Sequence, residues 1–319
     1  MSPSRSAKPR LDYLPGAASF LDPLRRDADM PDKARAVVIP FGLEASVSYG
    51  GGTKAGPQAI MAASHQLELY DEELAREAYI DYGIAAIAEP RIAKSVPKAL
   101  AQLEARVEAV LQAGKMPFVL GGEHSLTAGA IRAFARRYSD LVVLQFDAHA
   151  DLRDGYLGEH FSHAAAMRRV LDQPGHEHIS MIQVGIRAMS EPEAVFAHAN
   201  RDRIAMHLGL HQARWDIDAI LAPLKGRPVY ITVDIDALDG SVMPATGTPT
   251  PGGMSYLQLL AFLRRACELG SVVGMDLVEF APIKGFHAYD FLAAQLAAKM
   301  LNYALSGTTI RTCPPRRRA

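Results

Sequence analysis

One apolar run in the sequence ends in three evenly spaced side chains that could bind a cation. The stretch VVLQFDAHAD, residues 142–151, places Asp147, His149 and Asp151 at every second position where its apolar part ends. Side chains alternate between the two faces of an extended segment, so these three point the same way. Two carboxylates and an imidazole crowded on one face would repel one another unless a cation lay between them. The stretch therefore indicates a metal site.

Three further runs bring possible ligands to the ends of predicted strands. The strand PFVL is followed by GGEHSLT, which puts His124 in a loop just before a helix. The run YITVDIDALD carries Asp234 and Asp236 two positions apart, again on one face. The run VVGMDLVEF contains Asp276 and Glu279 near its end. In parallel sheets ligands bind at the carboxyl ends of the strands, so we expect these side chains to converge.

Six of these side chains form a donor set that is too large for one tetrahedral zinc ion. The set consists of His124, Asp147, His149, Asp151, Asp234 and Asp236. Two imidazoles and four carboxylates suit two cations that share carboxylates. Oxygen-rich ligation with one histidine per ion favours Mn²⁺, although Ni²⁺, Co²⁺ or Zn²⁺ could replace it in a purified sample. Two such ions can hold a hydroxide between them at neutral pH, and that hydroxide is the expected nucleophile.

Apolar runs typical of a buried parallel sheet alternate with amphipathic segments along the chain. The predicted strands are residues 36–40, 79–84, 117–120, 141–146, 178–184, 203–206, 229–233 and 271–278. The clearest predicted helices are residues 96–112, 125–136, 191–198, 216–224, 255–268 and 289–305. This alternation predicts an α/β fold of three layers, α/β/α, in which a mostly parallel sheet of about eight strands lies between helices.

The domain organisation follows from the same alternation. A chain of 319 residues could form one large α/β domain or two smaller ones. No linker interrupts the pattern, which favours a single domain over residues 35–306. Residues 1–34 are rich in Pro, Ser, Asp and Arg, and we expect an N-terminal arm on the surface. Residues 307–319 are expected to form a solvated C-terminal tail.

Composition and charge argue against several classes of protein. Hydrophobic residues make up 49% and charged residues 22%, which is ordinary for a soluble enzyme. The net charge is −1 and no basic block precedes the C-terminal tail, so nucleic acid is not an expected partner. No apolar run reaches the roughly 20 residues of a membrane span. The absence of an apolar signal core and of CxxC spacing predicts a cytoplasmic protein with no membrane partner.

Five of the motifs together resemble the ureohydrolase family, which includes arginases and agmatinases. In chain order they are GGEHSLT, FDAHADLRD, SHAAAMRR, VDIDALDGSVMPATGTPTPGG and MDLVEFAP, and the resemblance spans residues 36–305. It implies an arginase-like fold and hydrolysis of a guanidinium group to urea and an amine. It also implies two manganese ions bridged by Asp147 and Asp234, with His124 and Asp151 on one ion and His149 and Asp236 on the other.

The resemblance implies roles for the side chains around the ions. Glu279 would accept hydrogen bonds from the guanidinium. Asp151 would hold the proton of the hydroxide and pass it to the departing amine. His163, in the motif SHAAAMRR, would assist proton transfer or help to hold the substrate. Thr246, in a loop rich in glycine and proline, would contact the substrate. The family further suggests a homo-oligomer, either a trimer or a hexamer.

Agmatine is the first choice among the possible guanidine substrates. Arginases follow the DAHxD motif with Asn, Thr and Ser residues that bind the α-carboxylate and α-amine, whereas this loop reads LRDGYLGEHFSHA. The segments SYGGGTKAGPQAI and ELYDEEL resemble the agmatinase branch, whose substrate has a distal ammonium that Asp154, Glu159 or Glu44 could attract. Arg153 would instead suit the carboxylate of 4-guanidinobutyrate. Guanidinopropionate and free guanidine also stay open, and arginine is disfavoured.

Two other interpretations fit part of the pattern. A degenerate member of the fold could bind metal as a scaffold without catalysis, but such members usually lose ligands and this chain has all six. A single-zinc deacetylase of similar fold would need only one Asp, His, Asp set. An isolated aspartate at the end of a strand is ordinarily a cap or a turn residue, so the joint spacing of the six carries the prediction.

Overall fold

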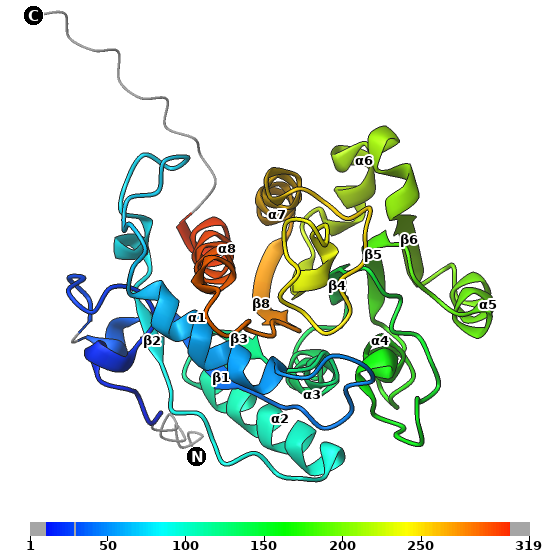
Figure 1. Cartoon of the computed structure of the whole chain (residues 1–319), viewed down its shortest axis with the longest axis horizontal. Coiled ribbons are helices and arrows are strands. Elements are labelled where there is room, and N and C mark those ends of the chain that lie inside the picture. The colour runs from blue at the N-terminus through cyan, green and yellow to red at the C-terminus, as the bar shows by residue number, and fades with distance from the viewer. Residues whose placement is uncertain (1–10, 29, 307–319) are drawn as a thin grey trace, which may run out of the picture.

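The computed structural model describes residues 11–28 and 30–306, which contain one sheet of eight parallel strands (Figure 1). The strand order is β2-β1-β3-β8-β7-β4-β5-β6. The strands are β1 (Ala36–Phe41), β2 (Ile84–Ala86), β3 (Met116–Gly121), β4 (Val142–Phe146), β5 (Ser180–Ile186), β6 (Ile204–Leu208), β7 (Pro228–Asp234) and β8 (Ser271–Val278). The predicted α/β fold with a parallel sheet is confirmed.

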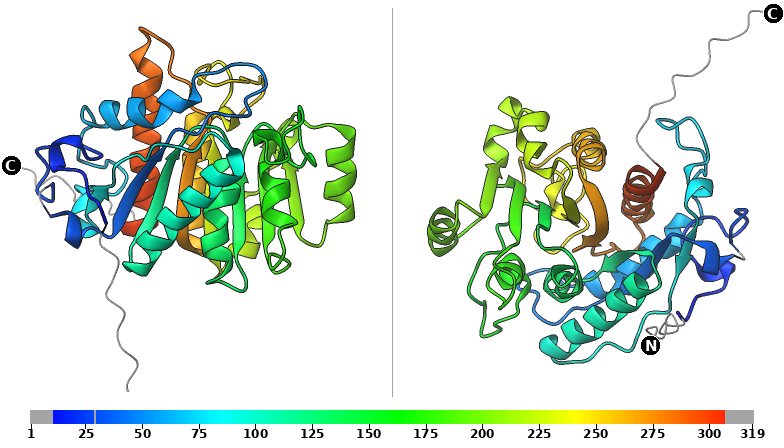
Figure 2. Two further views of the ribbon diagram at one scale, coloured as in Figure 1. Left: turned by 90° about the horizontal axis from the view of Figure 1, so that it is seen from below. Right: turned by 180° about the vertical axis from the view of Figure 1, so that it is seen from behind.

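Helices cover both faces of the sheet, which makes the three layers visible in Figure 2. One face packs against α1 (Gly56–Ser64), α6 (Ile217–Leu221), α7 (Tyr256–Leu269) and α8 (His287–Ser306). The other packs against α2 (Val96–Gln112), α3 (Leu126–Ala135), α4 (Ala166–Leu171) and, near the edge, α5 (Glu191–Ala199). Alternate residues of β1 supply the two cores: Ala36 and Val38 face one, and Val37 and Ile39 face the other.

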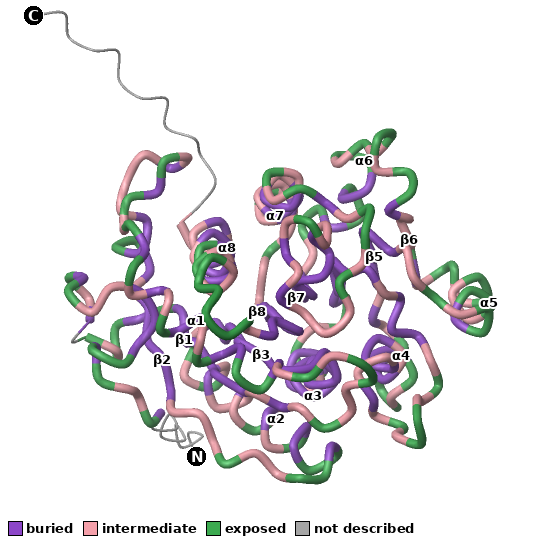
Figure 3. Tube along the Cα trace, in the orientation of Figure 1, coloured by how far each residue is buried: buried purple, intermediate pink, exposed green. Residues whose placement is uncertain are grey.

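Most elements follow from local sequence patterns. Helix α2 buries Val96, Leu100, Leu103, Val107 and Val110, whose spacing of three to four residues forms one apolar face. A proline at its first turn suits a helix start, because no intrahelical partner exists there for a backbone N–H. The central strands are buried along nearly their whole length, as expected for a sheet covered on both sides (Figure 3).

The predicted strand at residues 79–84 is wrong in position. Residues Ala78–Asp81 form a 3-10 helix, and β2 starts only at Ile84. Tyr79 and Tyr82 are buried while Ile80 is 50% exposed, a spacing of three that belongs to a helical turn. Between turn and strand, Gly83 has a φ of 66° and its N–H bonds to the carbonyl of Tyr79. The other seven predicted strands each overlap a strand of the sheet.

The N-terminal segment packs more closely than the surface arm expected from its composition. Phe20 is fully buried in the core beside α1 and α8, and Leu21 is nearly so. The N–H of Leu14 and the guanidinium of Arg25 bond to carbonyls of β2, so the segment covers this edge of the sheet. The average composition of the segment is polar, but its short apolar piece around Phe20 and Leu21 packs into the core. The predicted tail, residues 307–319, lies outside the described residues. None of the described helices is long and apolar enough to cross a membrane.

Candidate metal centre

The predicted ligands lie at the carboxyl ends of neighbouring strands of the sheet. His124 lies in the loop after β3, Asp147 directly follows β4, and Asp234 ends β7. The strand order β3-β8-β7-β4 makes these strands adjacent, and Glu279 directly follows β8 between them. Since all the strands run parallel, their carboxyl ends meet at the same place. The fold thus brings together residues that are up to 155 positions apart, such as His124 and Glu279.

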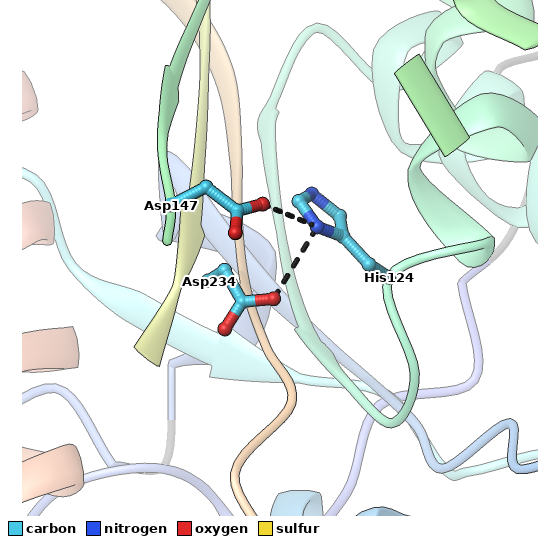
Figure 4. Close-up of side chains that lie close together, drawn as sticks. All are labelled: His124, Asp147 and Asp234. Carbon is cyan, nitrogen blue, oxygen red and sulfur yellow. Dashed lines mark ion pairs between the residues drawn. The ribbon is translucent and has the colours of Figure 1, made fainter. Parts of the chain in front are cut away.

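A first group of donors surrounds the imidazole of His124 (Figure 4). Nδ1 of His124 lies 3.1 Å from Oδ2 of Asp147, 3.0 Å from Oδ2 of Asp151 and 3.4 Å from Oδ2 of Asp234. All four side chains are buried. Nδ1 has no hydrogen-bond partner of ordinary geometry, although three oxygens surround it. One nitrogen and several carboxylate oxygens that converge in this way fit a divalent cation.

A second group lies on the other side of Asp147. Nδ1 of His149 is 3.0 Å from Oδ2 of Asp236 and 3.7 Å from Oδ1 of Asp147. Asp147 therefore turns one oxygen to each group, as a carboxylate shared by two cations must. Asp234 turns Oδ2 to the first group, and its Oδ1 accepts a hydrogen bond from the backbone N–H of Asp236 at 2.9 Å. Both groups could hold an ion.

The side chains of the cluster shift one another's pKa values strongly. Burial alone would lower the pKa of His149, but Asp147 and Asp236 outweigh it and raise this pKa to about 12. The same balance raises the pKa of His124 well above its ordinary value. Burial, together with the charge of Asp147, raises the pKa of Asp151 to about 6. Four buried carboxylates thus require positive charge nearby, from protons or from metal ions.

His163 and Glu279 meet beside the first group. Nδ1 of His163 lies 3.4 Å from Oε1 of Glu279, and the same oxygen accepts a hydrogen bond from the backbone N–H of His124 at 2.7 Å. Nε2 of His163 is buried without a partner. Burial would lower the pKa of His163, but Glu279 raises it.

Two of the predicted catalytic residues have backbone strain. Asp151 has a φ of 54° and Glu279 a φ of 62°, both in the left-handed region that residues with a Cβ seldom adopt. Such conformations cost about 1–3 kcal/mol each and cluster at functional sites. The surrounding contacts hold them: the N–H of Glu279 donates to the carbonyl of Gly122, and the carbonyl of Asp151 accepts from Met167.

A cavity of about 300 Å³ opens beside the cluster. Its lining includes five side chains that the sequence analysis singled out, namely His149, Asp151, His163, Asp234 and Glu279. Arg153, which the sequence singled out as a possible partner for a substrate carboxylate, also lines the cavity. The sequence did not indicate the other lining residues, which are Ser48, Tyr156, Ala164, Ala188, Met189, Glu193 and Thr248. Thr246, the predicted substrate contact, is not among the lining residues, and Thr248 lines the cavity in its place.

Glu193 is the most consequential residue that sequence reasoning missed. It is 3% exposed, and Oε2 lies 3.6 Å from Nε of Arg153, which also lines the cavity. The guanidinium of Arg153 stands over the ring of Tyr156 at 4.6 Å. Ser190 and Glu193 form a capping box at the start of α5, so the motif SEPE read as an ordinary helix start.

The three carboxylates that we expected to attract a distal ammonium do not line this cavity. Glu44 accepts hydrogen bonds from the N–H groups of Gly52 and Lys54. Asp154 is 72% exposed and pairs with Arg169. Glu159 accepts a hydrogen bond from the N–H of Phe161. These residues hold loops around the site. Glu193, whose Oε1 accepts a hydrogen bond from the N–H of Leu152 next to Asp151, is the acidic lining residue besides Asp151, Asp234 and Glu279.

The fold and the site define an α/β protein with side chains that could hold two metal ions at the carboxyl end of a parallel sheet. The chain belongs to the arginase family, whose model matches residues 34–302. As an arginase-family member related to named ureohydrolases, it is a ureohydrolase.

Three similar proteins illustrate the relationship. An N(1)-aminopropylagmatine ureohydrolase of Synechocystis sp. is 36% identical over 85% of this chain and 89% of its own length. An agmatinase of Bacillus subtilis is 33% identical over 86% of this chain and 92% of its own. The crystal structure of an agmatine ureohydrolase of Thermoplasma volcanium superposes with a TM-score of 0.77 at 31% identity, covering 86% of this chain and 91% of that one.

Proposed function

We propose that this ureohydrolase uses two Mn²⁺ ions to hydrolyse agmatine, giving urea and putrescine. The observation that carries the proposal is the pair of histidine and aspartate groups that share Asp147, beside a cavity that His163 and Glu279 line. The predicted ligands are His124, Asp147, His149, Asp151, Asp234 and Asp236. Oxygen-rich sites with one histidine each favour Mn²⁺ over softer ions.

The residues around the ions have complementary tasks in this proposal. Two bound ions would act as Lewis acids and activate water at neutral pH. Glu279 accepts hydrogen bonds from the guanidinium and orients its carbon. Asp151, which lines the cavity, accepts the proton of the attacking water and delivers it to the departing amine. His163 lies against Glu279 and assists that transfer.

Glu193 and Arg153, which both line the cavity, support a cationic substrate. Glu193 offers a buried carboxylate, and the charge of Arg153 is already engaged by Glu193 and by the ring of Tyr156. A substrate ammonium would replace Arg153 beside Glu193 without leaving the buried carboxylate unpaired. A substrate carboxylate, as in 4-guanidinobutyrate, would instead need Arg153 to leave Glu193.

N(1)-aminopropylagmatine is a second candidate substrate. Relatives from Synechocystis and Thermus thermophilus that are 36% and 38% identical to this chain are named for its hydrolysis. It carries the same guanidinium with a longer cationic chain, so the same part of the cavity would serve it.

The test is urea release from a panel of guanidines by the Mn²⁺-loaded protein, compared by kcat/KM. The panel contains agmatine, N(1)-aminopropylagmatine, 4-guanidinobutyrate, guanidinopropionate, arginine and free guanidine. We expect the two cationic-chain substrates to lead. Protein that binds two ions per chain and releases no urea from any of them would overturn the proposal in favour of a non-catalytic scaffold. One zinc ion per chain with amide cleavage would favour a deacetylase.

A further inference from the structure

A row of buried polar side chains crosses four strands beneath the predicted ligands. In the register of the sheet, Asp276 on β8 pairs with Thr232 on β7, Thr232 pairs with Gln145 on β4, and Gln145 pairs with Gln183 on β5. All four side chains are 0% exposed. We call these four residues the polar row. The sheet is otherwise largely apolar here, and buried amides and hydroxyls are costly unless they are paired.

Thr232, an inner member of the polar row, contacts the imidazole of His124. Nε2 of His124 lies 2.9 Å from Oγ1 of Thr232. If Nδ1 binds a cation, the ring proton must be on Nε2, which then donates to Oγ1. The hydroxyl of Thr232 must in turn donate elsewhere, and its cross-strand neighbour is Asp276. Sharing that proton fixes the tautomer and the orientation of the ring.

Asp276 is itself held in place. Its Oδ2 accepts hydrogen bonds from the hydroxyls of Thr127 at 2.8 Å and Tyr230 at 2.7 Å. Its Oδ1 is buried without a partner of ordinary geometry, so it is the carboxylate oxygen with capacity for the proton of Thr232. Because Asp276 is fully buried, it cannot form hydrogen bonds with solvent, and its position depends on these protein contacts.

Gln145, the other inner member of the polar row, contacts Asp147. Nε2 of Gln145 donates to Oδ2 of Asp147 at 2.7 Å. Nε2 of Gln183 donates to Oε1 of Gln145 at 2.6 Å and to the carbonyl of Ala150 at 2.8 Å. These bonds fix which end of the Gln145 amide faces the ligand. Oδ2 is also the oxygen that Asp147 turns to His124.

We propose that the polar row positions the ligands of the first metal site, the one around His124, and so sets the affinity of that site separately from the second. The two inner members of the row reach the first group: Thr232 contacts His124, and Gln145 bonds the oxygen that Asp147 turns to His124. Apart from the shared Asp147, the second group receives a 3.4 Å contact from Gln145 to the backbone carbonyl of His149. Partners of this kind typically change metal affinity about 10- to 100-fold. The inference rests on the proposed two-ion enzyme.

The test compares Thr232→Val, Thr232→Ser and Asp276→Asn with the wild-type protein in Mn²⁺ titrations of the metal-free chain. Thr232→Val keeps the volume and removes the hydroxyl, so we expect the first site to weaken by about 10- to 100-fold with the second within about twofold. Asp276→Asn should weaken the same site, and Thr232→Ser should restore it. Thr53→Val, which removes a buried hydroxyl bonded to Glu44, is the matched control and should change neither site.

Two further measurements keep the outcome interpretable. At a free Mn²⁺ concentration that fills both wild-type sites, Thr232→Val should retain about one ion per chain, and anomalous diffraction should place that ion beside His149. Equal loss from both sites, or no loss in Thr232→Val and Asp276→Asn, would overturn the inference. Thermal unfolding of the metal-free variants separates a folding defect from a ligand defect, and Asp276→Asn serves if Thr232→Val does not fold. A wild type that binds two ions and releases no urea would overturn the proposed function only.

Discussion

The carboxylate of Glu279 lies 3.4 Å from Nδ1 of His163 and also accepts the backbone N–H of His124. One side chain thus touches a predicted proton-transfer residue and the loop that carries a predicted metal ligand. A guanidinium bound to Glu279 would be held at a fixed distance from both.

Glu279→Gln should weaken guanidinium binding while metal binding stays intact. The amide keeps the shape and a hydrogen-bonding oxygen but loses the negative charge that a guanidinium requires. Hydrogen bonds to charged groups contribute about 1.5–3 kcal/mol, so we expect kcat/KM for agmatine to fall by at least about tenfold. Steady-state kinetics with metal analysis checks this, with Glu159→Gln as the control on a loop residue. Unchanged kinetics would remove Glu279 from the site.

His163→Ala should lower turnover with nearly unchanged metal content. General acid–base groups contribute about 10²- to 10⁴-fold to rate, and His163 is not in either group of potential ligands. His198→Ala, on the exposed side of α5, should have no effect. If His163→Ala retained full kcat across the pH profile, its assignment to proton transfer would be wrong.

Asp147→Ala should abolish both ion binding and activity. Asp147 turns one oxygen to His124 and the other to His149, so its removal takes a ligand from each site and leaves two cations unshielded from one another. We expect metal content well below one ion per chain and activity below about 1% of wild type. Asp154→Ala, a neighbouring exposed aspartate, is the control. Substantial activity in Asp147→Ala would refute the shared carboxylate.

Metal affinity should rise with pH. The raised pKa values of His124 and His149, the latter about 12, mean that both imidazoles keep a proton at neutral pH in the metal-free protein. Each must lose a proton to bind an ion, so affinity should rise about tenfold per pH unit for each proton displaced. Titration calorimetry in buffers of different ionisation enthalpy counts the protons released. An affinity independent of pH would contradict the imidazole ligands.

The raised pKa of His149 should make the metal-free protein less stable as pH rises, which is opposite to its effect on metal affinity. Because the pKa of His149 is raised from 6.5, its pairing stabilises the folded state fully below that value and is lost as pH rises toward 12. Added Mn²⁺ should therefore raise Tm most at alkaline pH. Differential scanning calorimetry with and without the ion would show this divergence.

Glu193→Gln should weaken binding of a substrate that carries a distal ammonium more than binding of one that does not. Loss of its charge removes the counter-ion for an ammonium, so we expect KM for agmatine to rise about tenfold. Free guanidine has no distal ammonium, and its kinetics should change less. An equal effect on both substrates would instead indicate that the substitution disturbs the start of α5, where the carboxylate of Glu193 accepts a hydrogen bond from the N–H of Ser190.

Sequence patterns predicted most of the elements, and they indicated side chains that converge in the fold, because both depend on local periodicity and on strand ends. Asp147, His149 and Asp151 follow one strand, and parallel strands bring Asp234 and His124 beside them. The failures came where several segments meet. The 3-10 turn at Tyr79 has the same apolar composition as a strand, and only its contacts distinguish the two.

The cavity-lining roles of Glu193 and Thr248 could not be predicted from local patterns. Glu193 has the sequence pattern of a helix-capping residue, and it does cap α5. Its side chain also lines the cavity, and no spacing in the sequence indicates this second role. Thr246 and Thr248 differ by two positions in a loop, and loop conformation decided which one lines the cavity. The polar row was likewise hidden, because pairing across four strands depends on register.

The strand order has a consequence for how the protein tolerates motion. The strands that carry the predicted ligands, β3, β7 and β4, occupy interior positions with β8 among them, and the sheet edges are β2 and β6. Fraying starts at edges and costs least there. Amide hydrogens of β6 can thus exchange with solvent through partial openings that leave the cluster assembled, whereas separating the predicted ligands from one another requires the centre of the sheet to open.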